Sequence, residues 1–183
     1  MATYIGLLRG INVGGSSMIA MSVLREFLEA VGCGRPRSLL QSGNLVFEST
    51  KRTGDDVERW LEAEAAKRLR RTTEWFVRTP KEWQDVIARN PFREEAERDP
   101  GRLHVVLLKK APSKPTVAAL RAAIVGREVV APGVRHLYAY YPAGAGRSRL
   151  TTAVIDSKLG TRGTARNWNT VLKLAKLGAQ AAG

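Results

Sequence analysis

The same order of predicted secondary-structure elements occurs twice along this 183-residue chain. In each half an apolar strand is followed by a helix, a β-hairpin and a second helix, although the residues of the two halves do not resemble each other. This order is typical of ferredoxin-like α+β units. We therefore predict an α+β protein with two ferredoxin-like β-α-β-β-α-(β) halves packed together, a helical connector and a C-terminal helix.

The first half, residues 1–90, alternates the hydrophobic periods of strands and helices. Its elements are a strand at 4–8, a helix with Leu24, Phe27, Leu28 and Val31 on one face and Gly32 at its end, a hairpin at Ser42-Gly43-Asn44, a helix opened by Thr53 in capping-box spacing, and a strand at 75–77. The run Thr79-Pro80-Lys81-Glu82 combines an N-cap, Pro at the first position and Glu at the third. It therefore begins the connector helix, which Asn90-Pro91 ends.

The second half, residues 91–183, repeats the order after a charged segment at 91–101. Its elements are a strand at 103–108, a helix capped by Ser113, a hairpin around Pro132-Gly133, a Gly-rich loop at 144–146, a helix from about 148 to 158 and a terminal helix from 167 to 177. Residues 160–165 stand where a final strand would return. The second half is thus predicted without a clear fourth strand.

Charge is segregated between the two halves. Residues 101–183 hold 14 Lys and Arg against Glu128 and Asp156, a net of +12, whereas residues 1–100 hold 16 against 15, a net of +1. Segregated charge produces a field that gathers anions. The second half is therefore expected to meet phosphate, nucleic acid or an acidic partner. In the first half, the basic cluster Lys67, Arg68, Arg70 and Arg71 is partly offset by Glu62 and Glu64 at helical spacing.

Several classes of protein receive little support. Cys33 stands alone, which argues against a disulfide framework, a thiolate metal site and a nucleophile. His104 and His136 lie in apolar strand patterns without ligands at metal spacing, so no metal is predicted. The chain lacks a signal-peptide pattern and any apolar run of membrane-spanning length. We expect a cytoplasmic protein that does not enter a membrane.

Several stretches resemble the family called domain of unknown function 1697. They are residues 7–15, residues 41–47, Asn90-Pro91-Phe92, Gly146-Arg147-Ser148 with Leu150-Thr151, and residues 166–174. They occur in the family's order nearly from end to end. The chain departs from the pattern at Arg149, where the family usually has Lys, and at Ala165, where it often has Thr. The resemblance implies an α+β fold and no particular activity.

Two Gly-rich loops between a predicted strand and helix are candidates for binding an anion. The first contains Arg9, Asn12, Gly14 and Gly15, and the second contains Arg147, Ser148 and Arg149. Exposed amides at a helix start and an arginine fork both suit an oxyanion. The first loop lacks the Gly-Lys-Ser/Thr ending of a P-loop. The alternative is a tight turn that needs positive φ, with Arg9 bridging to a carboxylate.

Two further segments allow both a functional and a structural interpretation. Arg166, Asn167 and Asn169 could bind a polar ligand that Trp168 walls, or Asn167 could cap the helix while Trp168 lies in the core. The segment Gln41, Ser42 and Asn44 could reach a pocket, or it could simply form a hairpin turn.

The leading hypothesis is a protein that binds a phosphate-bearing small ligand through Arg9, Arg147, Arg149 and Arg166. If it is an enzyme, transfer or isomerisation on an anionic substrate fits better than metal hydrolysis. The rival is nucleic-acid binding by the basic half, with Tyr138, Tyr140 and Tyr141 as a stacking platform. A third possibility is a protein–protein interaction module. The sequence indicates no particular cofactor or oligomeric state.

Overall fold

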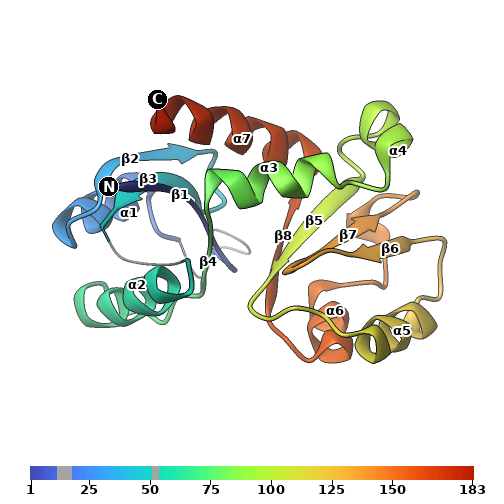
Figure 1. Cartoon of the computed structure of the whole chain (residues 1–183). Helices are drawn as coiled ribbons and strands as arrows, with labels where there is room; N and C mark the ends of the chain where they lie inside the picture. Colours follow the sequence, from blue (N-terminus) through green and yellow to red (C-terminus); the bar gives the residue numbers. More distant parts are fainter. Residues whose placement is uncertain (12–17, 51–53) are drawn as a thin grey trace. The chain divides into compact units, whose positions relative to one another are not determined.

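The computed structural model describes residues 1–11, 18–50 and 54–183. The chain forms two compact units: residues 1–84 with 173–183, and residues 85–172 (Figure 1). Each unit contains one four-stranded sheet in which all neighbouring strands are antiparallel. The α+β class and the two ferredoxin-like halves predicted from the sequence are therefore confirmed.

The first unit has the strand order β2-β3-β1-β4. Its elements are β1 (Ala2–Leu8), α1 (Met21–Ala30), β2 (Gly34–Leu39), β3 (Asn44–Ser49), α2 (Gly54–Arg68), β4 (Trp75–Arg78) and the start of α3 (Pro80–Ala88). The residue expected to open α2, Thr53, lies outside the described residues. Gly32, with φ of +89°, follows α1 as the left-handed end predicted for it.

One face of the first sheet packs on α1 and α2. Tyr4, Phe47 and Trp75 from three strands join Leu24 and Leu61 from the two helices in one buried cluster. The Phe47 and Trp75 rings meet edge to face, with centroids 6.4 Å apart, an arrangement that aromatic pairs prefer. A Cβ on Gly6 would lie 2.9 Å from Phe47 Cε1, so these rings need a glycine in the middle of β1.

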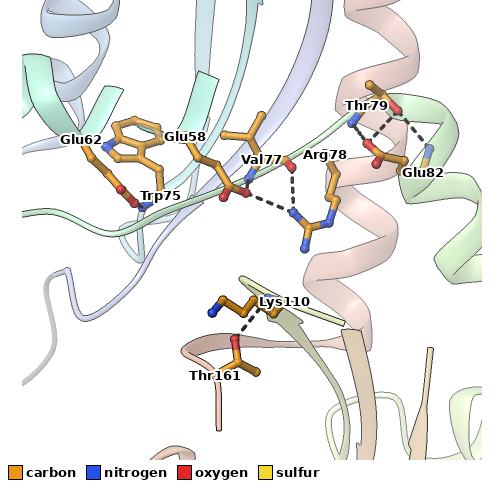
Figure 2. Close-up of polar contacts among 9 residues, drawn as sticks. All are labelled: Glu58, Glu62, Trp75, Val77, Arg78, Thr79, Glu82, Lys110 and Thr161. Atoms are coloured by element: carbon orange, nitrogen blue, oxygen red, sulfur yellow. Dashed lines mark hydrogen bonds and ion pairs between the residues drawn. The ribbon is translucent and has the colours of Figure 1, made fainter. Parts of the chain in front are cut away.

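The connector helix α3 begins as its sequence predicts. The Thr79 amide and hydroxyl both donate to Glu82 Oε2, at 2.7 and 3.0 Å, while the Glu82 amide donates to Thr79 Oγ1 at 3.2 Å (Figure 2). This reciprocal bonding satisfies amides that have no partner within the helix.

The second unit has the strand order β6-β7-β5-β8, which matches the first. Its elements are α4 (Arg93–Arg98), β5 (Leu103–Leu108), α5 (Lys114–Ala123), β6 (Val129–Pro132), β7 (His136–Tyr140), the 3-10 turn η1 (Ala145–Arg147), α6 (Thr152–Leu159), β8 (Gly163–Asn167) and the start of α7 (Trp168–Ala182). α5 begins at the predicted cap, since Ser113 Oγ accepts from the Thr116 amide. α5 and α6 cover one face of the sheet, with Val117, Leu120 and Ile155 in the core.

The structure corrects the sequence-based prediction at the end of the second unit. The helix expected from about 148 begins only at Thr152, because Thr151 is the residue whose side chain accepts from the Val154 amide. Residues 163–167 form a fourth strand by pairing with β5. The last helix therefore begins at Trp168 and runs to Ala182. The segment at 91–101, expected as a boundary, contains the short helix α4.

The two units also divide the chain differently from the expected boundary at residue 90. Residues 85–90 belong to the second unit, where Tyr138 donates its hydroxyl to the Val86 carbonyl at 2.6 Å. Residues 173–183 return to the first unit, because Gly178 of α7 lies against Ile5 so closely that a Cβ would be 2.9 Å from Ile5 Cδ1. Along the described chain, no helix is both long enough and apolar enough to cross a membrane.

Candidate anion-binding site

Three loops of the first unit meet where β1 ends. The Leu8 amide donates to the Gly43 carbonyl of the β2–β3 hairpin at 2.9 Å, and the Arg9 amide donates to the Glu74 carbonyl before β4 at 3.1 Å. Gly10 has φ of +66°, a left-handed conformation that glycine adopts without strain. Gly10 thus provides the positive φ that the tight-turn interpretation required, and the loops form a corner beside the sheet.

A cavity of about 290 Å³ opens at this corner. It combines two guanidinium groups, two hydroxyls and an apolar wall; the lining residues are Arg9, Gly10, Ile11, Ile19, Arg71, Thr72 and Thr73. Thr73 is buried, and its Oγ1 accepts from Trp75 Nε1 at 3.1 Å. Of the other residues predicted in the first loop, Asn12, Gly14 and Gly15 lie outside the described residues.

Sequence reasoning missed Arg71 because the whole basic cluster was assigned to a helix face. Lys67 and Arg68 do pair with Glu64, both at 3.1 Å. Their hydrogen bonds, with that from Lys67 the larger effect, hold the pKa of Glu64 below its usual range. Arg70, however, has φ of +51° after the end of α2. The chain turns there and brings Arg71 to the cavity. The sequence feature that could have identified Arg71 is the pair of basic residues just beyond the end of the helix.

Arg9 has a carboxylate beside it. Its Nε is 4.0 Å from Glu74 Oε1, and the two side chains are 20% and 28% exposed. The alternative interpretation, a bridge from Arg9 to a carboxylate, is therefore present in the structure. At 4.0 Å the two charged groups are at the long limit of an ion pair, which weakens their attraction. An incoming anion could compete with Glu74 for the guanidinium.

The hairpin residues Ser42 and Asn44 hold the turn together. Asn44 is fully buried, and its Nδ2 donates to the Leu39 carbonyl and to Ser42 Oγ, both at 2.9 Å. Gly43 has the left-handed φ, +77°. Gln41 lines a different hollow, of about 440 Å³, together with Arg25 and Ser38, which are hydrogen bonded to each other. A ligand role for these three predicted residues stays a prediction.

The loop with Arg147, Ser148 and Arg149 leads from the 3-10 turn η1 toward α6, whose N-cap is Thr151. Ser148 donates its hydroxyl to Glu128 and accepts from the Leu150 amide at 2.9 Å. Leu150 is buried, and its carbonyl accepts from the Tyr141 hydroxyl at 3.1 Å. Arg147 and Arg149 are exposed. The serine thus anchors the loop, and the two arginines remain available to an anion in solvent.

The segment from Arg166 to Asn169 follows mainly its structural interpretation. Asn167 Oδ1 accepts from the Thr170 amide at 3.1 Å, which caps α7, and Trp168 is only 5% exposed. Asn169 is exposed. Arg166 lies in β8 and donates to Thr164 Oγ1 and to the Ala165 carbonyl at 2.9 and 2.8 Å. Burial lowers the pKa of Arg166 to about 10, so the side chain stays charged at neutral pH.

The predicted arginines do not form one cluster within either unit. Arg9 belongs to the first unit, while Arg147, Arg149 and Arg166 belong to the second. Within the second sheet, β5 separates β7, after which the Arg147 loop follows, from the strand that carries Arg166. The cavity at Arg9 instead takes its second guanidinium from Arg71.

The three tyrosines of the nucleic-acid hypothesis are buried. Tyr138, Tyr140 and Tyr141 are 1%, 8% and 5% exposed, and their hydroxyls bond to the Val86 carbonyl, Asp99 and the Leu150 carbonyl. Burial raises the pKa of both Tyr138 and Tyr141 to about 12. They therefore form no exposed stacking platform, and that part of the hypothesis is wrong.

The structure shows the surroundings of Cys33 and His104, which the sequence analysis considered for metal or nucleophile chemistry. Within residues 1–11, 18–50 and 54–183, no group of three or more His, Cys, Asp or Glu could hold a metal ion. Cys33 is buried in the first core. His104 meets the Tyr141 ring edge to face, with centroids 5.1 Å apart.

Comparisons with known proteins concern the family and the fold. The model of a family described as "protein of unknown function (DUF1697)" matches residues 1–138. Among solved structures, the conserved bacterial protein SP0830 from Streptococcus pneumoniae is similar, with a TM-score of 0.73 and 21% identity over 96% of this chain and 98% of that chain. At this identity the likeness shows the fold alone. A comparison with curated proteins gives no significant match.

Proposed function

The chain belongs to the DUF1697 family of proteins of unknown function, and we propose that it binds a small phosphate-bearing ligand in the cavity beside Arg9. One observation carries the proposal: Arg9, Arg71, Thr72 and Thr73 line one hollow at the end of β1. Arginine presents its N–H groups as a planar fork that matches two oxygens of a phosphate. Threonine hydroxyls supply donors for the remaining oxygens.

The size and the wall of the cavity suit a compact ligand. Its volume of about 290 Å³ lies at the lower end of the roughly 300–1,000 Å³ typical of small-molecule pockets. Ile11 and Ile19 are both buried and line the same hollow. They would receive the apolar part of a ligand while the arginines hold its anionic group.

The first test is the binding of inorganic pyrophosphate, followed by a panel of nucleotides and sugar phosphates, measured by isothermal titration calorimetry. In Arg71→Gln we expect affinity to fall at least about tenfold, a loss of about 1.4 kcal/mol, because an exposed guanidinium is removed without disturbing the core. The matched control is Arg59→Gln, which removes an exposed arginine on α2 that pairs with Asp56. Equal affinity in wild type and Arg71→Gln would contradict the proposal.

The nucleic-acid hypothesis retains an electrostatic basis, the net charge of +12 in residues 101–183. The salt dependence of affinity distinguishes nucleic-acid binding from binding of a small ligand in the cavity. Binding along a phosphate backbone weakens steeply as salt rises, because each neutralised phosphate releases about one counterion. A ligand held in the cavity would lose much less affinity. Titrations with pyrophosphate and with a short single-stranded DNA at low and high salt therefore separate the two functions.

A further inference from the structure

The corner at the end of β1 has a counterpart at the end of β5. The Leu108 amide donates to the Arg135 carbonyl at 3.0 Å, as the Leu8 amide does to Gly43. The Lys109 amide donates to the Arg162 carbonyl at 3.0 Å, as the Arg9 amide does to Glu74. The same two backbone bonds thus close the same corner in both units.

The equivalent positions carry different charges. Arg9 corresponds to Lys109, Gly10 to Lys110, Gly43 to Arg135 and Glu74 to Arg162, as these bonds and the chain order align them. The ion pair between Arg9 and Glu74 in the first corner becomes two cations in the second. Thr73 corresponds to Thr161, so a threonine is kept at both corners.

The backbone of the second corner is held in place by side chains. The Lys110 amide donates to Thr161 Oγ1 at 3.1 Å (Figure 2). The Gly163 amide donates to Asp156 Oδ1 at 3.0 Å, and Gly160 ends α6 with a left-handed φ of +65°. These bonds fix the two loops that carry Lys109, Lys110 and Arg162 before any ligand arrives.

Four basic residues stand on the loops of this corner, Lys109, Lys110, Arg135 and Arg162, and one of them pairs with a carboxylate. Asp156 Oδ2 is 3.8 Å from Arg162 Nη1, and the arginine side chain is 56% exposed. Lys110 is also exposed, while Lys109 and Arg135 are half-buried. Basic residues gathered on neighbouring loops raise the local potential and attract an anion. An oxyanion placed among them would be stabilised by several charges at once.

We propose that Lys109, Lys110, Thr161 and Arg162 form a second phosphate-binding site, equivalent by internal repetition to the cavity beside Arg9. The inference rests on the proposed function for its class of ligand but not for its residues. The phosphate could belong to a small compound or to a nucleic-acid backbone, since the chemistry that the corner recognises is the same.

The test is the stoichiometry of pyrophosphate binding to the full chain by isothermal titration calorimetry. We expect two ions per wild-type chain, one in Arg9→Gln/Arg71→Gln, one in Lys110→Gln/Arg162→Gln, and two in the control Arg93→Gln, an exposed arginine on α4 at the other end of β5. Circular dichroism and thermal unfolding confirm that each variant is folded. Both variants replace two cations by neutral residues, so a general loss of charge cannot account for a selective effect.

Each outcome decides separately between the two sites. If only Arg9→Gln/Arg71→Gln loses an ion and Lys110→Gln/Arg162→Gln behaves as wild type, the second site is overturned and the proposed function stands. If only Lys110→Gln/Arg162→Gln loses a bound ion, the second site stands and the proposed function at the Arg9 cavity is overturned. If neither loses one, both are overturned. A second arm repeats the titration with single-stranded DNA. If Lys110→Gln/Arg162→Gln loses DNA affinity together with a pyrophosphate ion, the corner also accepts a backbone phosphate, whereas a lost ion with unchanged DNA affinity restricts the site to small compounds.

Discussion

The two units place an arginine at the same point of the same sheet and surround it differently. Arg78 of β4 pairs with Ile5, and Arg166 of β8 pairs with Val105 at the corresponding register. Each arginine donates Nη1 to the carbonyl of the preceding residue at 2.8 Å. The repeated fold therefore repeats even the local hydrogen bond of a side chain.

The two arginines differ in the acidic side chains around them. In the first unit, Glu58 Oε1 accepts from Arg78 Nη1 at 3.2 Å and from the Val77 amide at 2.7 Å (Figure 2). Glu62 accepts from the first amide of β4 as Asp156 does from the first amide of β8. Counting back one helical turn from Asp156, the residue that corresponds to Glu58 is Thr152. The fold thus fixes the backbone pattern, while each sequence sets the charge around it.

Replacement of the buried glutamate of the first unit, Glu58, is expected to have the largest effect on the free energy of unfolding. The Glu58 and Arg78 side chains are 5% and 4% exposed, and removal of one partner of a buried ion pair costs about 3–5 kcal/mol. Urea unfolding of Glu58→Gln should show a loss in this range, and Asp156→Asn, whose carboxylate is more exposed, should lose less. Equal losses in the two variants would show that burial of the pair does not distinguish the units.

A second comparison concerns which strand carries a glycine. In the first unit a Cβ on Gly6 would lie 3.4 Å from Trp75 Cε3, and the corresponding positions of the second unit hold Val106 and Gly163. A Cβ on Gly163 would lie 2.8 Å from Val106 Cγ1 and 3.1 Å from the Leu107 carbonyl oxygen. Gly163→Ala should therefore destabilise the protein by about 1–3 kcal/mol through overpacking. Gly101→Ala, where nothing lies within 4 Å of the new Cβ, is the control and should be near neutral in the same unfolding assay.

The helices after the first strand of each unit differ in their caps. α5 begins with a reciprocal capping box between Ser113 and Thr116, whereas α1 has Ala20 at its N-cap and therefore no side-chain cap. Ser113→Ala should cost about 1 kcal/mol, and Ala20→Ser should stabilise by a similar amount. Thermal unfolding measures both changes. A destabilised Ala20→Ser would contradict the view that α1 merely lacks a cap.

The smallest expected effect is on pH dependence, where Tyr4 and His104 occupy corresponding places in β1 and β5. Burial lowers the pKa of His104 below its ordinary 6.5 and raises that of Tyr4 above its ordinary 10. As pH falls below 6.5, the unfolded chain binds a proton at His104 before the folded chain does, so stability present above 6.5 is lost. As pH rises above 10, the unfolded chain loses the Tyr4 proton first, and stability is lost there.

Unfolding free energies measured from pH 4 to pH 12 check this prediction. His104→Phe should have a flatter acid limb than wild type, and Tyr4→Phe should have a flatter alkaline limb. Tyr138 and Tyr141, with a pKa of about 12 in the folded state, leave part of the alkaline loss in place. An unchanged acid limb in His104→Phe would exclude this residue as its source.

Elements that depend on bonds between near neighbours in the chain were predicted correctly, whereas elements that depend on contacts between distant residues were not. The starts of α3 and α5 were predictable because each capping bond joins residues three positions apart. The predicted start of α6 was wrong because Ser148 ties down the loop, donating to Glu128 across the unit and accepting from the Leu150 amide, while Thr151 caps the helix. β8 was missed because residues 163–167 have no apolar alternation. Their extended conformation comes from pairing with β5.

In the candidate site, too, residues marked by a local sequence pattern were predictable, and residues placed by the tertiary structure were not. Arg9 was predictable, since it stands beside Gly10 at the end of an apolar strand. Arg71, Thr72 and Thr73 were not, because only the turn after α2 brings them to Arg9. Burial of Tyr138, Tyr140 and Tyr141 was also a tertiary outcome, since alternation alone does not say whether the second face of a strand is covered.

The sequence by itself determined the α+β class, the repeated order of elements, the locally capped helix starts and the segregation of charge. These depend on periodicity, composition and bonds between near neighbours. Only the tertiary structure decided which loops share a corner and which charges meet there. The bonds that close both corners, from Leu8 to Gly43, Arg9 to Glu74, Leu108 to Arg135 and Lys109 to Arg162, join residues far apart in the chain. No local pattern encodes them, because they form only when the sheets assemble.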